Sequence, residues 1–427
     1  MAVMKYPRPA WLLCGVLISI PLGCSSSDSR AATNHPTTSA TARSDGPRVF
    51  QSPPGALADA RDRYRAGDPS VAPAVNAIRA EADKALKDRP FTIVHKTHPL
   101  PGVDVHDYVS IAPYFWPDTK SKEGLPYYRR DGERNPETRE YDSPALSEMS
   151  SHVSTLALAG YLTGDDRYAK RAAELLRVWF FDDATRMNPN LNHAQLIKGQ
   201  NDGRGTGIIE SNRLLPVVDA IGMMQQSGAW SADDQSKIQD WFRQYVQWMR
   251  QSKNGKAEAA AGNNHGSWYD AQLATYLMFL GDDAGARQLL ETVKENRIAR
   301  QIEPSGEMPR ELARTKSFHY SVFNLSALTT LADLGQRLNV DLGRYQTADG
   351  RSIRKALDWL IPFALNQKKW EHQQIIPLES HILLVPLRRA EAAYHEPHYE
   401  EVVRETYRDF STDRDNLRFP ATEGPTR

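Results

Sequence analysis

The sequence predicts a mainly α-helical fold, an incomplete (α/α) toroid or barrel of antiparallel helical hairpins. Apolar residues recur at three- and four-residue steps along much of the chain, as from Ile238 to Met249. A helix, a Gly-Asp-Asp turn and a second helix are expected twice, around 164–166 and 281–283. Strand-like alternation is scarce, and 109–112 is its best candidate. A ring of hairpins also suits the chain length, because each hairpin packs only on its neighbours.

Residues 1–23 predict an export signal. Lys5 and Arg8 give a positively charged start, and the apolar run that follows is short for a membrane span and ends at small residues. The sequence Leu-Gly-Cys-Ser then resembles a bacterial lipobox, in which Cys24 would be lipidated and become the mature N-terminus. Ser25 favours the outer membrane by the same resemblance. We therefore expect an exported, periplasmic lipoprotein of a Gram-negative-type bacterium; an ordinary cleaved signal peptide is the alternative.

Cysteine content and charge exclude several classes. Cys14 lies inside the signal, so the mature chain would carry at most the lipidated cysteine and can form neither a disulfide framework nor a thiolate metal site. Lys plus Arg and Asp plus Glu each number 53, and loss of the signal removes two positive charges, which leaves −2. This balance gives no sign of nucleic-acid binding, and an anionic substrate would need a local basic cleft. No obligate protein partner is evident.

Composition divides the remaining chain into three parts. Residues 24–49 are rich in Ser, Thr, Ala and Asp without apolar periodicity, and they predict a disordered linker. Residues 50–410 form the toroid domain, because no domain-sized linker interrupts them. Residues 411–427 are polar and predict a C-terminal tail that drapes over the surface.

Four segments break the helical rhythm and are expected to carry the functional site, since loops on a rigid scaffold usually do. They are 107–118, 188–213, 263–270 and 303–320. These segments hold much of the chain's Asn, His and Gly.

Asn264 and His265 precede an apolar helix expected to begin near Gly266. Free N–H groups and the helix dipole at such a terminus favour an anion. An ordinary N-cap for Asn264 and a structural role for His265 are the alternatives.

Arg314 and Tyr320 come before a second apolar helix, expected to begin near Ser321. Six residues correspond to about 240° on a regular helix, so the two would not share a face there. Prolines and a glycine upstream predict an irregular loop, from which both could enter a cleft. Arginine is a natural bidentate partner of a carboxylate. The alternatives are a surface ion pair of Arg314 with Glu311 or Glu307, and a core role for Tyr320.

Five ordered motifs across residues 105–325 resemble the alginate lyase superfamily of polysaccharide lyases. They are DYVSIAPYFWPD at 107–118, MNPNLNHAQ at 187–195, GIIESNR at 207–213, NNHGSWYD at 263–270 and ELARTKSFHYS at 311–321. The resemblance implies an (α/α) toroid with a long open cleft. The spacing of the arginine and the tyrosine is one residue shorter than in the best-known bacterial alginate lyases. This chain is more similar to the branch with glucuronan-active and broader alginate-active enzymes.

The resemblance implies roles for four residues. Asn264, His265 and Arg314 would neutralise the carboxylate of a uronate, and Tyr320 would be the catalytic tyrosine. Neutralisation would stabilise the enediolate-like dianion that forms when the proton at C5 is removed. Near Arg314, the pKa of Tyr320 is expected to be lowered, so that the phenolate takes this proton and returns it to O4 of mannuronate or glucuronate. For guluronate, His265 would be the base. No metal or other cofactor is required.

Supporting residues are expected around this centre. Aromatic side chains of the first motif would stack on sugar rings, polar residues would line the subsites, and a carboxylate would orient its neighbours. For His319, a structural role is the favoured alternative to substrate binding. The substrate-binding candidates are Asn263, Tyr114, Trp116, Gln195, Asn201, Glu210, Arg213 and His319.

Two other functions stay open. A glycoside hydrolase on a similar toroid needs two carboxylates across the scissile bond, for which Glu148, Glu210 and Asp270 are candidates. A non-catalytic uronan-binding lipoprotein would keep the cleft without turnover. Zinc is not expected, because the histidine spacings match no common ligand motif.

Overall fold

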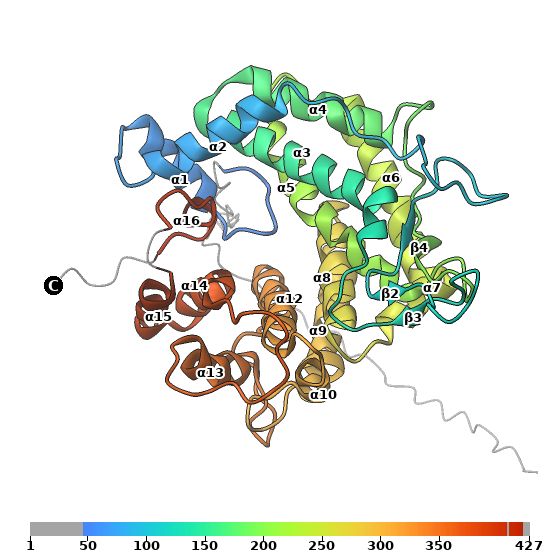
Figure 1. The fold of residues 1–427 in the computed structure, drawn as a ribbon. Helices are drawn as coiled ribbons and strands as arrows, with labels where there is room; N and C mark the ends of the chain where they lie inside the picture. The colour runs from blue at the N-terminus through green and yellow to red at the C-terminus, as the bar shows by residue number, and fades with distance from the viewer. Residues whose placement is uncertain (1–45, 408–409, 422–427) are drawn as a thin grey trace, which may run out of the picture. The chain divides into compact units, whose positions relative to one another are not determined.

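The computed structural model describes residues 46–407 and 410–421. The predicted signal, Cys24 and most of the predicted linker lie outside these residues. The described chain is built mainly from helices, as predicted, and Figure 1 shows them in chain order. The helices are α1 Ala56–Arg65, α2 Ala72–Ala85, α3 Ser143–Thr163, α4 Asp166–Phe180, α5 Leu215–Met224, α6 Ala232–Gln251, α7 Lys253–Ala259, α8 Asn264–Phe279, α9 Asp283–Val293, α10 Ala299–Gln301, α11 Pro309–Leu312, α12 Ser317–Arg337, α13 Ile353–Ala364, α14 Leu384–Tyr394, α15 His398–Thr406 and α16 Asp415–Arg418.

Both predicted Gly-Asp-Asp hairpins are confirmed. Gly164 ends α3 in the left-handed region at φ 75°, and the Asp165 side chain accepts a hydrogen bond from the backbone N–H of Arg167, which caps α4. Gly281 has φ 83° after α8, and Asp282 caps α9 in the same way. Glycine adopts this conformation without the steric cost of a Cβ, and an aspartate satisfies free N–H groups at a helix start.

Helix α8 lies inside the helical array. It contacts α5, α6, α7, α9 and α12, and Figure 1 shows it between the green and orange parts of the chain. Nearly all of its residues are buried, as expected for a helix surrounded by others, and its buried polar side chains Asp270 and Gln272 are paired within the protein. The side chains at its N-terminus are therefore fixed by a rigid element.

Short strands bring two distant segments together. The predicted strand at 109–112 is confirmed as β1 Val109–Ile111, which pairs in parallel with β4 His193–Leu196. A second pair, β2 Phe115–Trp116 and β3 Tyr128–Arg129, is antiparallel. Neither β4 nor this second pair is evident in the sequence pattern. Through these strands, the segment 107–118 lies beside 188–213.

Helix starts and domain ends differ from the expectations. α8 begins at Asn264 rather than near Gly266, so most of 263–270 is helical. α12 begins at Ser317 rather than near Ser321, so Tyr320 lies on the helix and not in the loop before it.

At the N-terminal end, Val49 is buried and the backbone at Arg48 packs so tightly on Gly222 that a Cβ would not fit. The linker predicted over 24–49 therefore ends before this point. At the other end, Leu417 and Phe419 are buried around α16, so the segment up to 421 is packed rather than draped over the surface. No helix within residues 46–407 and 410–421 is both long and apolar enough to cross a membrane.

Candidate active site

A cleft of about 630 Å³ is lined by residues from all four irregular segments, including the start of α8. Its lining includes all four residues proposed for catalysis, Asn264, His265, Arg314 and Tyr320. The cleft is strongly basic, as expected for an anionic substrate on a chain with no net charge. The charged side chains that line it, histidine aside, are Arg129, Arg134, Arg204, Arg213, Arg314 and Glu210.

Asn264 is held by a buried carboxylate. Its backbone N–H and its side-chain amide donate to the two carboxylate oxygens of Glu311 on α11, each at 2.7 Å. Asn263, not Asn264, is the N-cap of α8, and it makes no side-chain cap bond, so the N-cap interpretation of Asn264 is wrong. The amide nitrogen carries two N–H groups, and Glu311 uses one. The second has no hydrogen-bond partner among the described residues, and Asn264 belongs to the cleft lining although it is fully buried in the protein alone.

His265 is oriented by Glu258 on α7. The ring nitrogen Nδ1 lies 2.7 Å from the Glu258 carboxylate, whose side chain is only 1% exposed. Within the described chain, Nε2 has no hydrogen-bond partner. A carboxylate on one ring nitrogen fixes the ring and leaves the other nitrogen for chemistry in the cleft.

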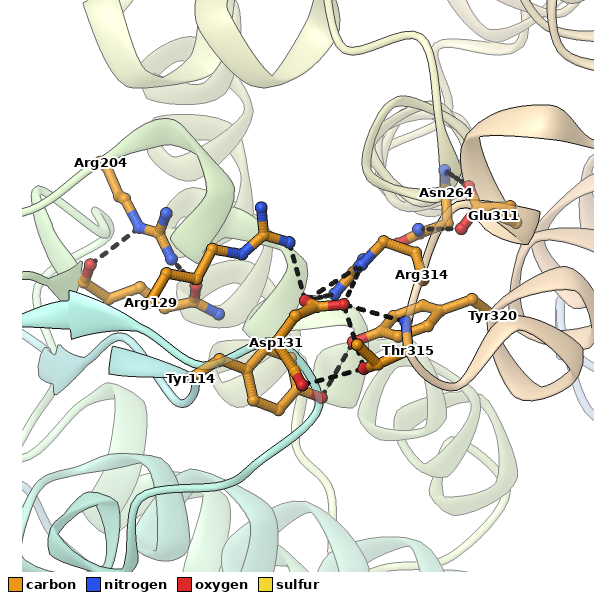
Figure 2. A network of polar contacts seen from close by, with 10 residues as sticks. Tyr114, Arg129, Asp131, Arg204, Asn264, Glu311, Arg314, Thr315 and Tyr320 are labelled. Carbon is orange, nitrogen blue, oxygen red and sulfur yellow. Dashed lines mark hydrogen bonds and ion pairs between the residues drawn. The ribbon is translucent and has the colours of Figure 1, made fainter. Parts of the chain in front are cut away.

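Arg314 is paired with Asp131, which follows β3. Two guanidinium nitrogens approach the carboxylate at 3.0 and 2.7 Å, and the backbone N–H of Thr315 donates to it at 3.1 Å (Figure 2). The alternative of an ion pair with Glu311 or Glu307 is therefore wrong. Burial acts to raise the pKa of Asp131, but the hydrogen bonds from Arg314 and Thr315 outweigh it and hold the pKa well below its usual range.

Tyr320 lies on the first turn of α12, with the Arg314 guanidinium 3.7 Å from its ring centroid. Its hydroxyl donates to the Tyr114 hydroxyl at 2.9 Å. Burial, followed by the neighbouring Tyr114, raises the pKa of Tyr320, and Arg314 lowers it by less. The expectation of a lowered pKa is therefore wrong. The reason is that the energetic cost of desolvating the phenolate in this largely buried site exceeds the stabilisation from Arg314, whose charge is already paired with Asp131.

A polar network supports the opposite side of the cleft. Glu210 is buried and accepts hydrogen bonds from the hydroxyls of Tyr108 and Ser110, both at 2.7 Å. Gln195 donates to Glu210 at 3.3 Å and accepts from Arg204 at 2.9 Å. Glu210 thus has the contacts of an orienting group, as predicted from the sequence.

Three candidates do not line the cleft. The Trp116 indole donates to the Glu133 carbonyl, and the Asn201 side chain accepts from backbone N–H groups of its own loop. Of the two β2 residues, Phe115 and not Trp116 lines the cleft, because neighbouring side chains on a strand point to opposite faces. His319 contacts Gln374 and Glu379, outside the cleft lining. The other candidates, Asn263, Tyr114, Gln195, Glu210 and Arg213, do line the cleft.

Several residues that hold the site could not be predicted from the sequence. Asp131 is 183 residues from Arg314, and Glu258 belongs to no recognisable motif. Glu311 stands at the start of a motif, but its partner is Asn264, 47 residues away, rather than Arg314. Arg204 carried a usable signal, because it stands between Gly203 and Gly205 in an irregular segment. Each glycine approaches other backbone too closely for a Cβ, so the loop that presents Arg204 is tightly packed.

The carboxylates proposed for hydrolysis do not form a pair across the cleft. Asp270 is buried in an ion pair with Arg297, and Glu148 lies on α3 outside the lining. Glu210 is the single acidic residue among the described residues that line the cleft. Elimination beside a carboxylate, in contrast, needs cations, amides and a proton carrier at one place. The fold and the cleft therefore define a polysaccharide lyase.

The chain belongs to the alginate lyase family. The family model described as alginate lyase matches residues 92–370. A crystal structure of an alginate lyase from Bacteroides ovatus is similar to it with 36% identity and a TM-score of 0.86, over 88% of this chain and all of that one. A variant of alginate lyase A1-III complexed with a tetrasaccharide shares the fold, at 17% identity and a TM-score of 0.53, over 82% of this chain and 95% of that one. No curated protein matches the sequence.

Proposed function

We propose that this polysaccharide lyase cleaves β-1,4-linked polyuronates, either alginate with mannuronate-type linkages or glucuronan, by β-elimination. The observation that carries the proposal is the cleft in which five arginines and one glutamate surround Tyr320, His265 and Asn264. A chain of carboxylated sugars matches this charge, and membership of the alginate lyase family agrees with it.

The proposed reaction begins with neutralisation of the uronate carboxylate. The second amide N–H of Asn264, a protonated Nε2 of His265 and the Arg314 nitrogen not bound to Asp131 are the donors available on this side of the cleft. Donors placed where negative charge develops stabilise the enediolate-like dianion.

Proton transfer is assigned to Tyr320. As phenolate it takes the proton from C5; the C4–O4 bond then breaks, a C4–C5 double bond forms, and the phenol gives its proton to O4 of the leaving chain. One residue can serve both steps in mannuronate and glucuronate, because H5 and O4 lie on the same side. For guluronate they lie on opposite sides, and a neutral His265, held by Glu258, is the natural base.

A screen of purified polymannuronate, polyguluronate and glucuronan tests this function. Lyase action gives ultraviolet absorbance from the C4–C5 double bond together with new chain ends. New reducing ends without that absorbance would instead indicate a hydrolase, and tight binding without any product would indicate a non-catalytic binding protein. Product sizes from the same reactions distinguish endo from exo action.

The proposed site of action is the periplasmic face of the outer membrane. This part rests on the sequence of residues 1–25 alone, where an export signal is followed by Cys24. Expression in a Gram-negative host should place the protein in the membrane fraction, and Cys24→Ser should release it to the soluble periplasm. Equal fractionation of both forms would contradict the lipid anchor.

A further inference from the structure

Arg204 is a half-buried arginine without an acidic partner. Its Nε donates to the Gln195 backbone carbonyl at 3.1 Å and one Nη donates to the Gln195 side chain at 2.9 Å. No carboxylate among the described residues lies within ion-pair distance of it. The other terminal nitrogen has no partner there and is not enclosed by protein. Arg204 lines the same cleft as Asn264 and Tyr320, and Figure 2 shows it on the far side of Arg129 from them.

This arrangement is costly for the free enzyme. Burial lowers the pKa of Arg204 to about 10, although Glu258 and Glu210 attract its charge from a distance. Two arginines that are buried more fully have a carboxylate in contact: Arg297 pairs with Asp270, and Arg388 with Glu400. Arg337, which has no ion pair either, donates to the backbone carbonyls of Val49 and Ser52 instead. A buried charge is normally paired, because desolvation otherwise disfavours it.

The surroundings hold Arg204 in place without neutralising it. Its guanidinium lies over the Phe115 ring, 5.2 Å from the centroid. Gln195, which accepts both of its hydrogen bonds, has φ 49° and donates in turn to the buried Glu210. Arg204 is therefore connected to the Glu210 carboxylate only through Gln195, by two successive hydrogen bonds. The outward edge of the Arg204 guanidinium faces the cleft.

We propose that Arg204 binds the carboxylate of a uronate unit in the cleft, so that the substrate supplies the missing counterion. The proposal rests on the proposed function and deepens it, because it separates two tasks among the cleft arginines. Arg314 has Asp131 as counterion and lies on the Tyr320 ring, so it positions the catalytic tyrosine and offers only its remaining nitrogen to the reacting uronate. Arg204 has its charge unpaired, and its planar fork suits a carboxylate. Arg204 is then a substrate-binding residue rather than part of the structural frame.

Binding measured without turnover tests this assignment. In full-length Tyr320→Phe enzyme, calorimetry compares a defined oligosaccharide of mannuronate, and one of glucuronate, with their carboxyl-reduced counterparts. Adding Arg204→Gln should raise Kd for the acidic oligosaccharide about 10- to 100-fold, the range for a lost hydrogen bond to a charged group. The affinity for the carboxyl-reduced counterpart should change little. Arg344→Gln is the matched control, because Arg344 is bonded to the Ala393 carbonyl away from this cleft, and it should change Kd less than about twofold.

Melting temperatures check that the variants fold, and Arg204→Lys provides a second test. Lysine keeps the charge but not the fork, so a smaller increase in Kd is expected, again only for the acidic oligosaccharide. An unchanged Kd in Arg204→Gln, or an equal loss for acidic and carboxyl-reduced oligosaccharides, would overturn this proposal alone. If the Tyr320→Phe parent binds neither acidic oligosaccharide, the proposed function and this proposal both fail.

Discussion

Asp131→Asn removes the counterion of Arg314 while keeping the side-chain shape. The pair is largely enclosed, with 14% of the Arg314 side chain and 16% of the Asp131 side chain exposed. Loss of one partner costs about 3–5 kcal/mol in a fully buried pair and about 0–1 kcal/mol at the surface. Because Asp131 also accepts from Thr315, we expect a loss of about 2–3 kcal/mol in the free energy of unfolding. Urea denaturation measures it directly.

The same substitution should lower kcat more than it changes KM. Arg314 would no longer be fixed over the Tyr320 ring, and a displaced catalytic group can cost up to about 100-fold in rate. Glu133→Gln is the control, since it breaks a nearby exposed pair with Arg130 and should cost less than about 1 kcal/mol. Equal stability losses in the two variants, or a raised KM with unchanged kcat in Asp131→Asn, would refute the positioning role of Arg314.

Three further predictions follow from pKa and orientation. Because the pKa of Tyr320 is raised, the phenolate is a minor form at neutral pH, and kcat/KM should rise by up to about tenfold per pH unit into the mildly alkaline range; a flat profile contradicts this. The depressed pKa of Asp131 means that its stabilising contribution is present above about pH 4, the ordinary value of an unfolded aspartate, and is lost as the pH falls below it. The gap in unfolding free energy between wild type and Asp131→Asn should therefore narrow in acid, and a constant gap would count against the pairing. Finally, Phe115→Ala removes the ring that supports Arg204 and should weaken substrate binding by about 1 kcal/mol, which raises KM several-fold. Trp116→Ala should leave KM unchanged, because its indole is bonded to the Glu133 carbonyl outside the cleft.

Local sequence signals predicted the scaffold well. The Gly-Asp-Asp turns are short-range features, since a left-handed glycine and a capping aspartate act within one turn of the chain. The hairpins at 164–166 and 281–283 could therefore be predicted without knowledge of the fold. The strand β4 could not, because its pairing with β1 depends on chain segments about eighty residues apart.

In the candidate site, too, the residues within local motifs could be predicted and their distant partners could not. Asn264, His265, Arg314 and Tyr320 were identified from motifs, and they do line one cleft. Their partners were not predicted, because contacts such as Asp131 with Arg314 span 183 residues and carry no local pattern.

The direction of the Tyr320 pKa shift needed three-dimensional information too. The sequence shows that an arginine is near, but not that Asp131 already neutralises it or that the phenol is desolvated.

The central claim is that Tyr320 transfers the proton during elimination. Tyr320→Phe keeps the ring under Arg314 and removes only the hydroxyl. With the polyuronate that wild type cleaves best, this variant should show no increase in ultraviolet absorbance while its melting temperature stays close to that of wild type. Tyr345→Phe, which removes a hydroxyl bonded to Glu295 away from the cleft, should keep full activity. Formation of the unsaturated product by Tyr320→Phe at the wild-type rate would contradict the account.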